Sequence, residues 1–313
     1  MKVVLTHVGG SIPSYVVYCL RQYRIFNPSA ETIFIAAQKS LDTVKDLFRA
    51  LKIQGVPEES LDSAPLISEF RKRSWFKSSD ILGTTYPSQS DFWHNTLERL
   101  FFIEAFMCQD GCREIFHFEN DVMIYCQLDR VQNRLVNLKS FHGIYITPVG
   151  DEWIACGLVF IRDVDALTRF CRFVLEEMKK GDENIRREHH LSMVSDMTLL
   201  KVFADKSKDV DYFPILPEGE HANHFEDFLS IFDPASWGQY VGGTNNGVGP
   251  GWAGSHHYIG KEILDGKHKV IWKQEGRYRT PWVEGLTGKQ TRINNLHIHS
   301  KQLQNFISEP GLT

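Results

Sequence analysis

The sequence lacks the features that mark several large classes of protein. Its 313 residues contain no run of about 18 uncharged apolar residues, so we expect no transmembrane helix, and any membrane contact would be peripheral. The apolar run near the N-terminus, which reads MKVVLTHVGG, is too short for a secretory signal peptide. Internal repeats, heptads and low-complexity tails are also lacking. These absences predict a globular protein of the cytoplasm.

Cysteine is scarce, with six residues scattered through mostly apolar sequence. This pattern is typical of buried free thiols in a reducing compartment. Cys108 and Cys112 lie four residues apart, but no second pair completes a zinc site. We therefore expect free cysteines, which agrees with a cytoplasmic location.

Positive charge is also in short supply. The chain has 35 Lys and Arg against 39 Asp and Glu, a net charge of −4. A protein that binds nucleic acid through its phosphates would normally be basic, so we exclude nucleic acid as a partner. The 12% of aromatic residues argues against disorder. Some of the 39 acids and 13 histidines are candidates for a metal site.

Strand-like and helix-like segments alternate along the chain. Residues 2–8 form a short apolar run that ends at Gly9 and Gly10, as in a buried strand. Ser11 then offers an N-cap, and Pro13 a first-turn residue, for a helix to about Tyr23. Further strands are expected at 32–37, 115–118, 143–147 and 154–161, and further helices at 41–51, 92–108, 167–178 and from 195 onward. The alternation predicts an α/β fold with a mostly parallel central sheet flanked by helices.

The amino-acid composition changes after residue 205. Glycine, asparagine, tryptophan and histidine dominate residues 237–257, which suits a long loop. We therefore expect residues 1–313 to form one domain with a looped C-terminal portion. The glycine-rich stretch 242–254, with Trp237, Tyr240 and Trp252, suits a lid over a ligand. Alternatively, these aromatic residues anchor the loop to the core.

An acidic cluster marks the end of one predicted strand. Glu119 and Asp121 flank Asn120, between an apolar strand and the apolar residues 122–125. In open α/β sheets, ligands bind at the carboxyl ends of the strands. Two carboxylates beside buried strands are costly without a cation or hydrogen-bond donors, and Mg²⁺ or Mn²⁺ prefers oxygen ligands. The cluster therefore indicates a divalent cation site, with a pair of solvated turn acids as the alternative.

The cluster and its surroundings resemble the GT-A class of nucleotide-sugar-dependent glycosyltransferases over most of the chain. The class carries an Asp-x-Asp metal signature at the end of a central strand, where this chain has Glu119-Asn120-Asp121. The likeness rests on the order of the segments Ser-Ile-Pro-Ser-Tyr, Asn-Pro, Glu-Arg, Phe-His-Phe-Glu-Asn-Asp-Val, Phe-Asp-Pro-Ala-Ser-Trp-Gly-Gln-Tyr-Val-Gly-Gly and Leu-His-Ile-His-Ser-Lys.

The resemblance implies a metal-dependent enzyme that moves a sugar from a nucleoside-diphosphate sugar to a hydroxyl of a glycan or glycoconjugate. Residues 1–125 would form the nucleotide-binding half and residues 126–313 the acceptor-side half, with Mn²⁺ or Mg²⁺ as cofactor. Two alternatives stay open. One is a catalytically inactive protein that binds a sugar or nucleotide. The other is a nucleotidyltransferase that makes sugar nucleotides, although the basic glycine-rich loop that such enzymes need is missing after the first strand.

The resemblance also assigns metal ligands. Asp121 would bind the metal directly, and Glu119 would contact the ribose, the donor sugar or a metal-bound water. A histidine near the C-terminus completes the coordination in many members. His297 and His299 are two residues apart and would face the same side of an extended segment, so either could reach the metal. Two surface histidines on a late strand are the alternative.

Other residues receive donor-binding roles from the same resemblance. Thr6, His7 and Val8 would hold the base and ribose at the end of the first strand, although a plain strand end is the alternative. Arg99 would meet a phosphate, unless it forms a salt bridge on its helix. Lys301 would contact the diphosphate, with a solvated lysine as the alternative.

Asp196 is the candidate general base. It begins a predicted helix where inverting GT-A enzymes often place a carboxylate that accepts the proton of the acceptor hydroxyl. Helix capping alone would also favour an aspartate there. Asp233, Glu226 and Asp227 are rival candidates. A retaining enzyme would not require such a base.

Overall fold

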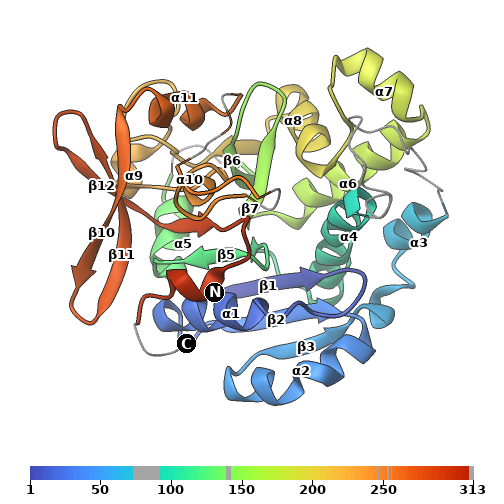
Figure 1. Cartoon of the computed structure of the whole chain (residues 1–313). Coiled ribbons are helices and arrows are strands. Elements are labelled where there is room, and N and C mark those ends of the chain that lie inside the picture. The colour runs from blue at the N-terminus through green and yellow to red at the C-terminus, as the bar shows by residue number, and fades with distance from the viewer. Residues whose placement is uncertain (73–91, 139–141, 245–246, 252–253, 255, 310–313) are drawn as a thin grey trace.

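The computed structural model describes all residues except 73–91, 139–141, 245–246, 252–253, 255 and 310–313, and its helices and strands form a layered α/β arrangement (Figure 1). Among the described residues, none of the helices combines the length and apolar character needed to cross a bilayer. All six cysteines are free, as predicted.

A seven-stranded sheet forms the centre of the fold. Four of its six neighbouring strand pairs are parallel, and β7 is antiparallel to both of its neighbours. This arrangement confirms the predicted α/β fold with a mostly parallel sheet. In spatial order the strands are β3 (Gln54–Pro57), β2 (Glu31–Ala36), β1 (Lys2–His7), β4 (Ile115–Phe118), β7 (Ile154–Ile161), β6 (Ile144–Pro148) and β8 (Val210–Tyr212).

The helices cover both faces of this sheet because alternate strand residues point to opposite sides. On β1, Val3 and Leu5 pack into one hydrophobic core and Val4 into the other. The first core takes residues from α1 (Val16–Phe26), α2 (Gln38–Ala50) and α5 (Leu128–Val136). The second takes residues from α3 (Pro65–Arg71), α4 (Phe92–Asp110), α6 (Val164–Met178), α7 (Asp182–His189) and α8 (Asp196–Lys206).

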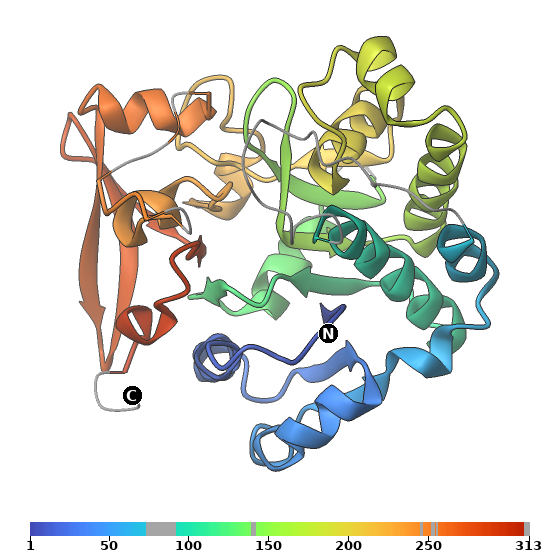
Figure 2. The same cartoon turned by 45° about the vertical axis from the view of Figure 1, so that its right-hand side comes forward.

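Two smaller sheets contribute residues to the first core, and the four-stranded one stands to one side of the central sheet (Figure 2). One has the order β10 (His268–Glu275), β11 (Tyr278–Gly285), β12 (Gln290–Ile293) and β9 (Ser230–Ile231). The other pairs β13 (Asn295–His297) with β5 (Val122–Ile124). The short elements that complete the chain are η1 (Glu58–Leu61), α9 (Phe225–Phe228), α10 (Trp237–Gly242), α11 (Tyr258–Leu264) and η2 (Leu303–Phe306).

Most predicted elements are present, with two informative differences. Ser195 caps α8 as expected, in a capping box with Thr198. Ser11 does not cap α1, which begins at Val16 with Tyr15 in the N-cap position and without a side-chain cap. Gly9 lies so close to α4 that a Cβ there would meet the Asn95 amide nitrogen at 2.7 Å. The β10–β11 hairpin was not predicted, although its Gly-Arg turn between Glu275 and Tyr278 is a recognisable hairpin signal.

The central sheet joins the two predicted halves of the chain. Strands β1 to β4 come from residues 1–125, and β6, β7 and β8 come from residues 126–313. A fully buried glutamine, Gln22 on α1, fastens the C-terminal segment to them. Its amide donates to the carbonyl of Ile124 and to Ser308 Oγ at 2.9 Å each, and accepts from Ser308 N at 2.8 Å. Gln22 therefore holds β5 and the C-terminal segment in place.

We expect Gln22→Met to lower the free energy of unfolding by about 2–4 kcal/mol, because a side chain of similar size would leave buried polar groups unpaired. Denaturant titration measures this effect. Gln38→Met is the matched control, since Gln38 is exposed on α2 and its side-chain amide donates to Asp42, which is also exposed. Equal stability of the two variants would contradict the role given to Gln22.

Candidate functional site

Strand β4 directs the acidic motif toward α4. Phe116 and Phe118 pack into the first core, so His117 points to the opposite face, where α4 lies. Glu119 continues the same alternation, and its amide donates to the carbonyl of Gly157 on β7 at 3.1 Å. The Glu119 carboxylate therefore leaves the sheet edge on the side of α4.

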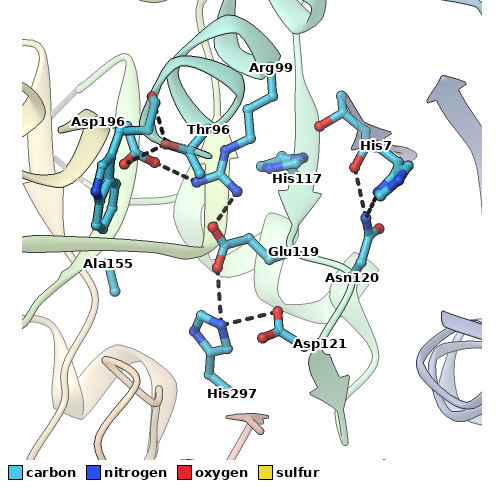
Figure 3. A network of polar contacts seen from close by, with 12 residues as sticks. His7, Thr96, Arg99, His117, Glu119, Asn120, Asp121, Ala155, Asp196 and His297 are labelled. Carbon is cyan, nitrogen blue, oxygen red and sulfur yellow. Dashed lines mark hydrogen bonds and ion pairs between the residues drawn. The ribbon is translucent and has the colours of Figure 1, made fainter. Parts of the chain in front are cut away.

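Arg99 on α4 receives this carboxylate and joins it to Asp196 (Figure 3). Its guanidinium forms an ion pair with Glu119, and its second nitrogen lies 2.6 Å from Asp196 Oδ2. The hydroxyl of Thr96 donates to the other oxygen, Asp196 Oδ1, at 3.2 Å. Burial opposes a charge on Arg99, but the two carboxylates outweigh it and raise the pKa of Arg99. Arg99 therefore forms a buried salt bridge to two other segments of the chain and not one on the surface of its own helix, and its contact with a phosphate stays a prediction.

A histidine from the C-terminal segment contacts both acids of the motif. His297 Nε2 lies 3.1 Å from Glu119 Oε2 and 3.1 Å from Asp121 Oδ1. The pairing of β13 with β5 explains this contact, because His297 stands opposite Val122, the residue after Asp121. One ligand atom from each of these three side chains lies within 4.8 Å of the others. The structure thus brings together Glu119, Asp121 and His297, which the sequence placed in one metal site.

Opposite charges stabilise one another in this group. Burial works against an ionised Asp121, yet His297 and Lys301 hold the pKa of Asp121 well below its usual value. Burial also opposes a charge on Glu119, and Arg99 and His297 lower its pKa. For His297 the burial effect is outweighed by Asp121, so the pKa of His297 is raised. Lys301 is half-buried and forms an ion pair with Asp121, and its contact with a diphosphate stays a prediction.

His299 lies next to His297 but has different partners. The ring centroids of the two histidines are 4.3 Å apart. His299 Nδ1 is 3.0 Å from the amide nitrogen of Gln239, and burial together with His297 lowers the pKa of His299 to about 3. His299 does not belong to the group of three possible ligands among the described residues. The structure thus favours His297 as the histidine ligand, and a role for His299 stays a prediction.

The predicted nucleotide edge touches the acidic motif through Asn120. The Asn120 amide donates to the carbonyl of Thr6 at 3.0 Å and lies 3.5 Å from His7 Nδ1. His7 Nε2 in turn lies 3.0 Å from the carbonyl of Ser11 in the loop after β1. Val8 follows the strand and packs against the second core. Thr6 and His7 therefore lie beside the motif at the end of β1, with Val8 next in the chain, and their contact with a base or ribose stays a prediction.

Asp233 has a structural role that sequence reasoning missed. It is fully buried, and its Oδ1 accepts from the amides of Ser236 at 2.8 Å and Trp237 at 2.9 Å. Its Oδ2 accepts from the amides of Gly238 at 2.9 Å and His297 at 2.8 Å. Both oxygens of Asp233 are therefore used by backbone donors, which explains its burial, and its rival role as a base stays a prediction.

Two glycines lie very close to His297, because they have no side chain that would clash with it. A Cβ at Gly157 would lie 2.9 Å from His297 Nδ1, and a Cβ at Gly238 would lie 2.1 Å from the His297 carbonyl oxygen. Only glycine permits so close an approach to a backbone or ring. Asp233 thus fixes the backbone of His297, and the two glycines leave room for it. The ring Nδ1 is buried without a hydrogen-bond partner among the described residues.

The remaining candidates are less closely tied to the motif. Glu226 and Asp227 are exposed on α9, where Asp227 lies 3.7 Å from His224. Trp237 is fully buried, which supports the anchor interpretation of this aromatic residue. Tyr240 packs partly buried against the first core, and Trp252 lies outside the described residues.

Buried polar atoms without a protein partner gather around the motif. His117 Nδ1 donates to the carbonyl of Val4 at 2.9 Å, while its Nε2 is buried without a partner among the described residues. Burial and Arg99 lower the pKa of His117 to about 4. His117 was missed, although its place two residues before Glu119 on the strand was a usable signal. The buried atoms at the site that have no partner within the described part of the chain are Thr6 Oγ1, Arg99 Nε, His117 Nε2, Asn120 Oδ1, His297 Nδ1 and Ser300 Oγ. Such atoms are rare in folded proteins and favour a polar ligand here.

The donor set fits a hard divalent cation. Two carboxylates and one imidazole are ligands that Mn²⁺ accepts, and Mg²⁺ accepts the carboxylates. All three side chains present their oxygen or Nε2 atoms toward one another. Glu119, Asp121 and His297 are thus the described residues able to hold the predicted metal at this edge.

Comparison with known proteins gives structural neighbours only. No family model matches the chain, and no curated protein matches it in sequence. Mouse xyloside xylosyltransferase 1 in its apo form is 10% identical, with 74% of this chain and 94% of that chain covered at a TM-score of 0.48. The galactosyltransferase LgtC, in complex with donor and acceptor sugar analogues, is 12% identical. The match covers 68% of this chain and 73% of that chain, with a TM-score of 0.38. A cytidylyltransferase from Leptospira borgpetersenii is 8% identical. The match covers 70% of this chain and 76% of that chain, with a TM-score of 0.38. Glycosyltransferases, the class that the sequence resembles, are therefore among its structural neighbours.

We expect Asp233→Asn to weaken both folding and Mn²⁺ binding, because an amide nitrogen would face backbone donors that now meet a carboxylate oxygen. The loss of stability should be about 2–4 kcal/mol, as for other buried charged groups with several hydrogen bonds. Thermal unfolding and Mn²⁺ titration measure the two effects. Asp227→Asn, on the exposed α9, should change neither, and an unchanged Asp233→Asn would disprove the positioning role.

Proposed function

We propose that the protein is a divalent-metal-dependent glycosyltransferase that moves a sugar from a nucleoside-diphosphate sugar to a hydroxyl acceptor. The observation that carries the proposal is the convergence of Glu119, Asp121 and His297 at the end of β4. The acidic motif of the sequence resemblance and a histidine from the end of the chain thus meet at the sheet edge where α/β proteins bind ligands. A glycan or glycoconjugate is the proposed acceptor, and the cytoplasm the proposed location.

Asp121 and His297 would hold the metal, with Glu119 beside them. Such a metal, Mn²⁺ or Mg²⁺, supplies positive charge that stabilises the departing nucleoside diphosphate. Lys301 adds a second positive charge at the same place, since its ammonium group contacts Asp121. We assign Lys301 to the diphosphate of the donor, in agreement with the attraction of an ammonium group for phosphate.

The end of β1 would hold the nucleoside. Thr6, His7 and Val8 form this edge, and Asn120 fixes its distance from the two carboxylates through the Thr6 carbonyl. Thr6 Oγ1 and Asn120 Oδ1 are buried without partners among the described residues, so each has hydrogen-bonding capacity for a ribose or base.

Asp196 stays the proposed general base for an inverting reaction. Its carboxylate would accept the proton of the acceptor hydroxyl while the hydroxyl oxygen attacks the anomeric carbon and the diphosphate leaves. Thr96 and Arg99 orient this carboxylate through Oδ1 and Oδ2. Arg99 also forms an ion pair with Glu119, so the same guanidinium contacts both the proposed base and the proposed metal site.

The decisive experiment is a donor screen. The protein is incubated with a panel of nucleoside-diphosphate sugars and Mn²⁺ or Mg²⁺, and release of nucleoside diphosphate is measured with and without chelator. We expect slow hydrolysis of one donor that the chelator abolishes. Asp121→Ala should reduce it about 100-fold or more, since metal-based charge stabilisation contributes several kcal/mol to the transition state.

Glu226→Ala is the control for this screen, because Glu226 is an exposed acid on α9. Release of pyrophosphate from a nucleoside triphosphate and a sugar phosphate would replace the proposal with a nucleotidyltransferase. Tight donor binding without turnover across many acceptors would replace it with a catalytically inactive binding protein.

A second prediction concerns the two histidines. His297→Ala should weaken Mn²⁺ binding at least tenfold, because it removes the imidazole that faces both carboxylates. His299→Ala should have a smaller effect, because His299 faces Gln239 instead. Isothermal titration with MnCl₂ measures both affinities, and intact binding in His297→Ala would rule out this histidine as a ligand.

A further inference from the structure

A cavity of about 620 Å³ lies away from the metal centre, where α1, α5 and the four-stranded sheet meet. Its lining includes residues of α5, β11 and β12 and the loop after α9, and excludes Glu119, Asp121 and His297. The volume is in the range that accommodates one or two sugar rings or a molecule of similar size.

Positive charge is concentrated at this cavity in an otherwise acidic chain. Arg130 and Arg134 both come from α5, four residues apart, and Arg292 comes from β12. Like charges at this helical spacing repel each other and cost stability. Glu275 is the one acid among the described lining residues, and its carboxylate lies 3.2 Å from Arg292. The cavity therefore carries an excess of positive charge.

The three guanidinium groups retain unused donors. Arg130 has no ion pair and no side-chain hydrogen bond within the described part of the chain, and Arg134 donates to the carbonyl of Phe228. Arg292 donates to the Tyr125 carbonyl at 2.6 Å, while its Nε is buried with no partner among the described residues. Arginine forks with free donors are suited to carboxylate and phosphate oxygens.

Aromatic side chains form the apolar part of the same wall. Phe26 and Tyr278 stand with their ring centroids 5.4 Å apart, and Trp282 also lines the cavity. At the rim, Leu229 is 63% exposed and adopts a left-handed backbone conformation, with φ of 51°. A leucine in this conformation is strained, and such strain is concentrated at functional sites.

We propose that this cavity binds an anionic saccharide, that is, a sugar ring that carries a phosphate or a carboxylate. The arginines would bind the anionic group, and the aromatic wall would cover the apolar face of the ring. The proposal does not depend on the proposed function, because the cavity and the metal centre share no residue.

Saturation-transfer NMR on the full chain tests the proposal with four probes: glucose 1-phosphate, glucuronate, glucose and inorganic phosphate. We expect saturation transfer to the ring protons of one or both anionic sugars and little transfer to glucose, with only weak competition by inorganic phosphate. The double variant Arg130→Gln/Arg134→Gln should reduce the transfer at least threefold. The two anionic probes distinguish a phosphate ligand from a carboxylate ligand.

Two further variants keep the test specific. Arg172→Gln/Arg186→Gln removes the same charge from exposed positions on α6 and α7 and should leave the signal unchanged. Asp121→Ala disables the metal centre and should also leave it unchanged, whatever the outcome of the donor screen. Equal transfer to glucose, full displacement by inorganic phosphate, loss of the signal in Asp121→Ala, or a folded Arg130→Gln/Arg134→Gln variant that binds normally would each overturn the proposal.

Discussion

A mostly buried row of alternating acidic and basic side chains is the constraint on which the rest of the site depends. Its members, in order of contact, are Asp196, Arg99, Glu119, His297, Asp121 and Lys301. Charges removed from water are costly unless each has a partner of opposite sign, so no member of the row can be placed independently of its neighbours. The row crosses from α8 and α4, over the end of β4, to the C-terminal segment. Packing of those elements and pairing of those charges therefore require each other.

The two acids of the motif are held by different parts of the fold. Glu119 is held by Arg99 on α4, whereas Asp121 is held by Lys301 and by His297, whose amide is bound by Asp233. The distance between the two carboxylates is thus set by how the helical layer packs against the β5–β13 pair. A cation between them would join two layers of the fold as well as two side chains.

The sequence predicted the central fold and the centre of the site, because both follow from local patterns. Alternating strands and helices, the apolar strand before Glu119, and the His-x-His pattern near the C-terminus are all visible over short windows. The partners of Arg99 and the role of Asp233 are not, since they depend on contacts between distant segments. The aspartate next to Pro234 reads as an ordinary turn residue, and only the folded chain shows four backbone amides on its carboxylate. The Gly-Arg turn of the β10–β11 hairpin is a local signal, but it lies in the C-terminal portion that the composition predicts to be looped.

The pairing of β13 with β5 has a consequence for how the protein matures. Asp121 and Lys301 are in contact although they lie 180 residues apart in the chain. During synthesis, the first strands and helices can pack while the acidic motif still faces water without its basic partners. The row of charges closes only after residue 301 has left the ribosome, and such distant contacts form slowly. A nascent or truncated chain that lacks residue 301 would therefore carry the central sheet without the complete row of charges.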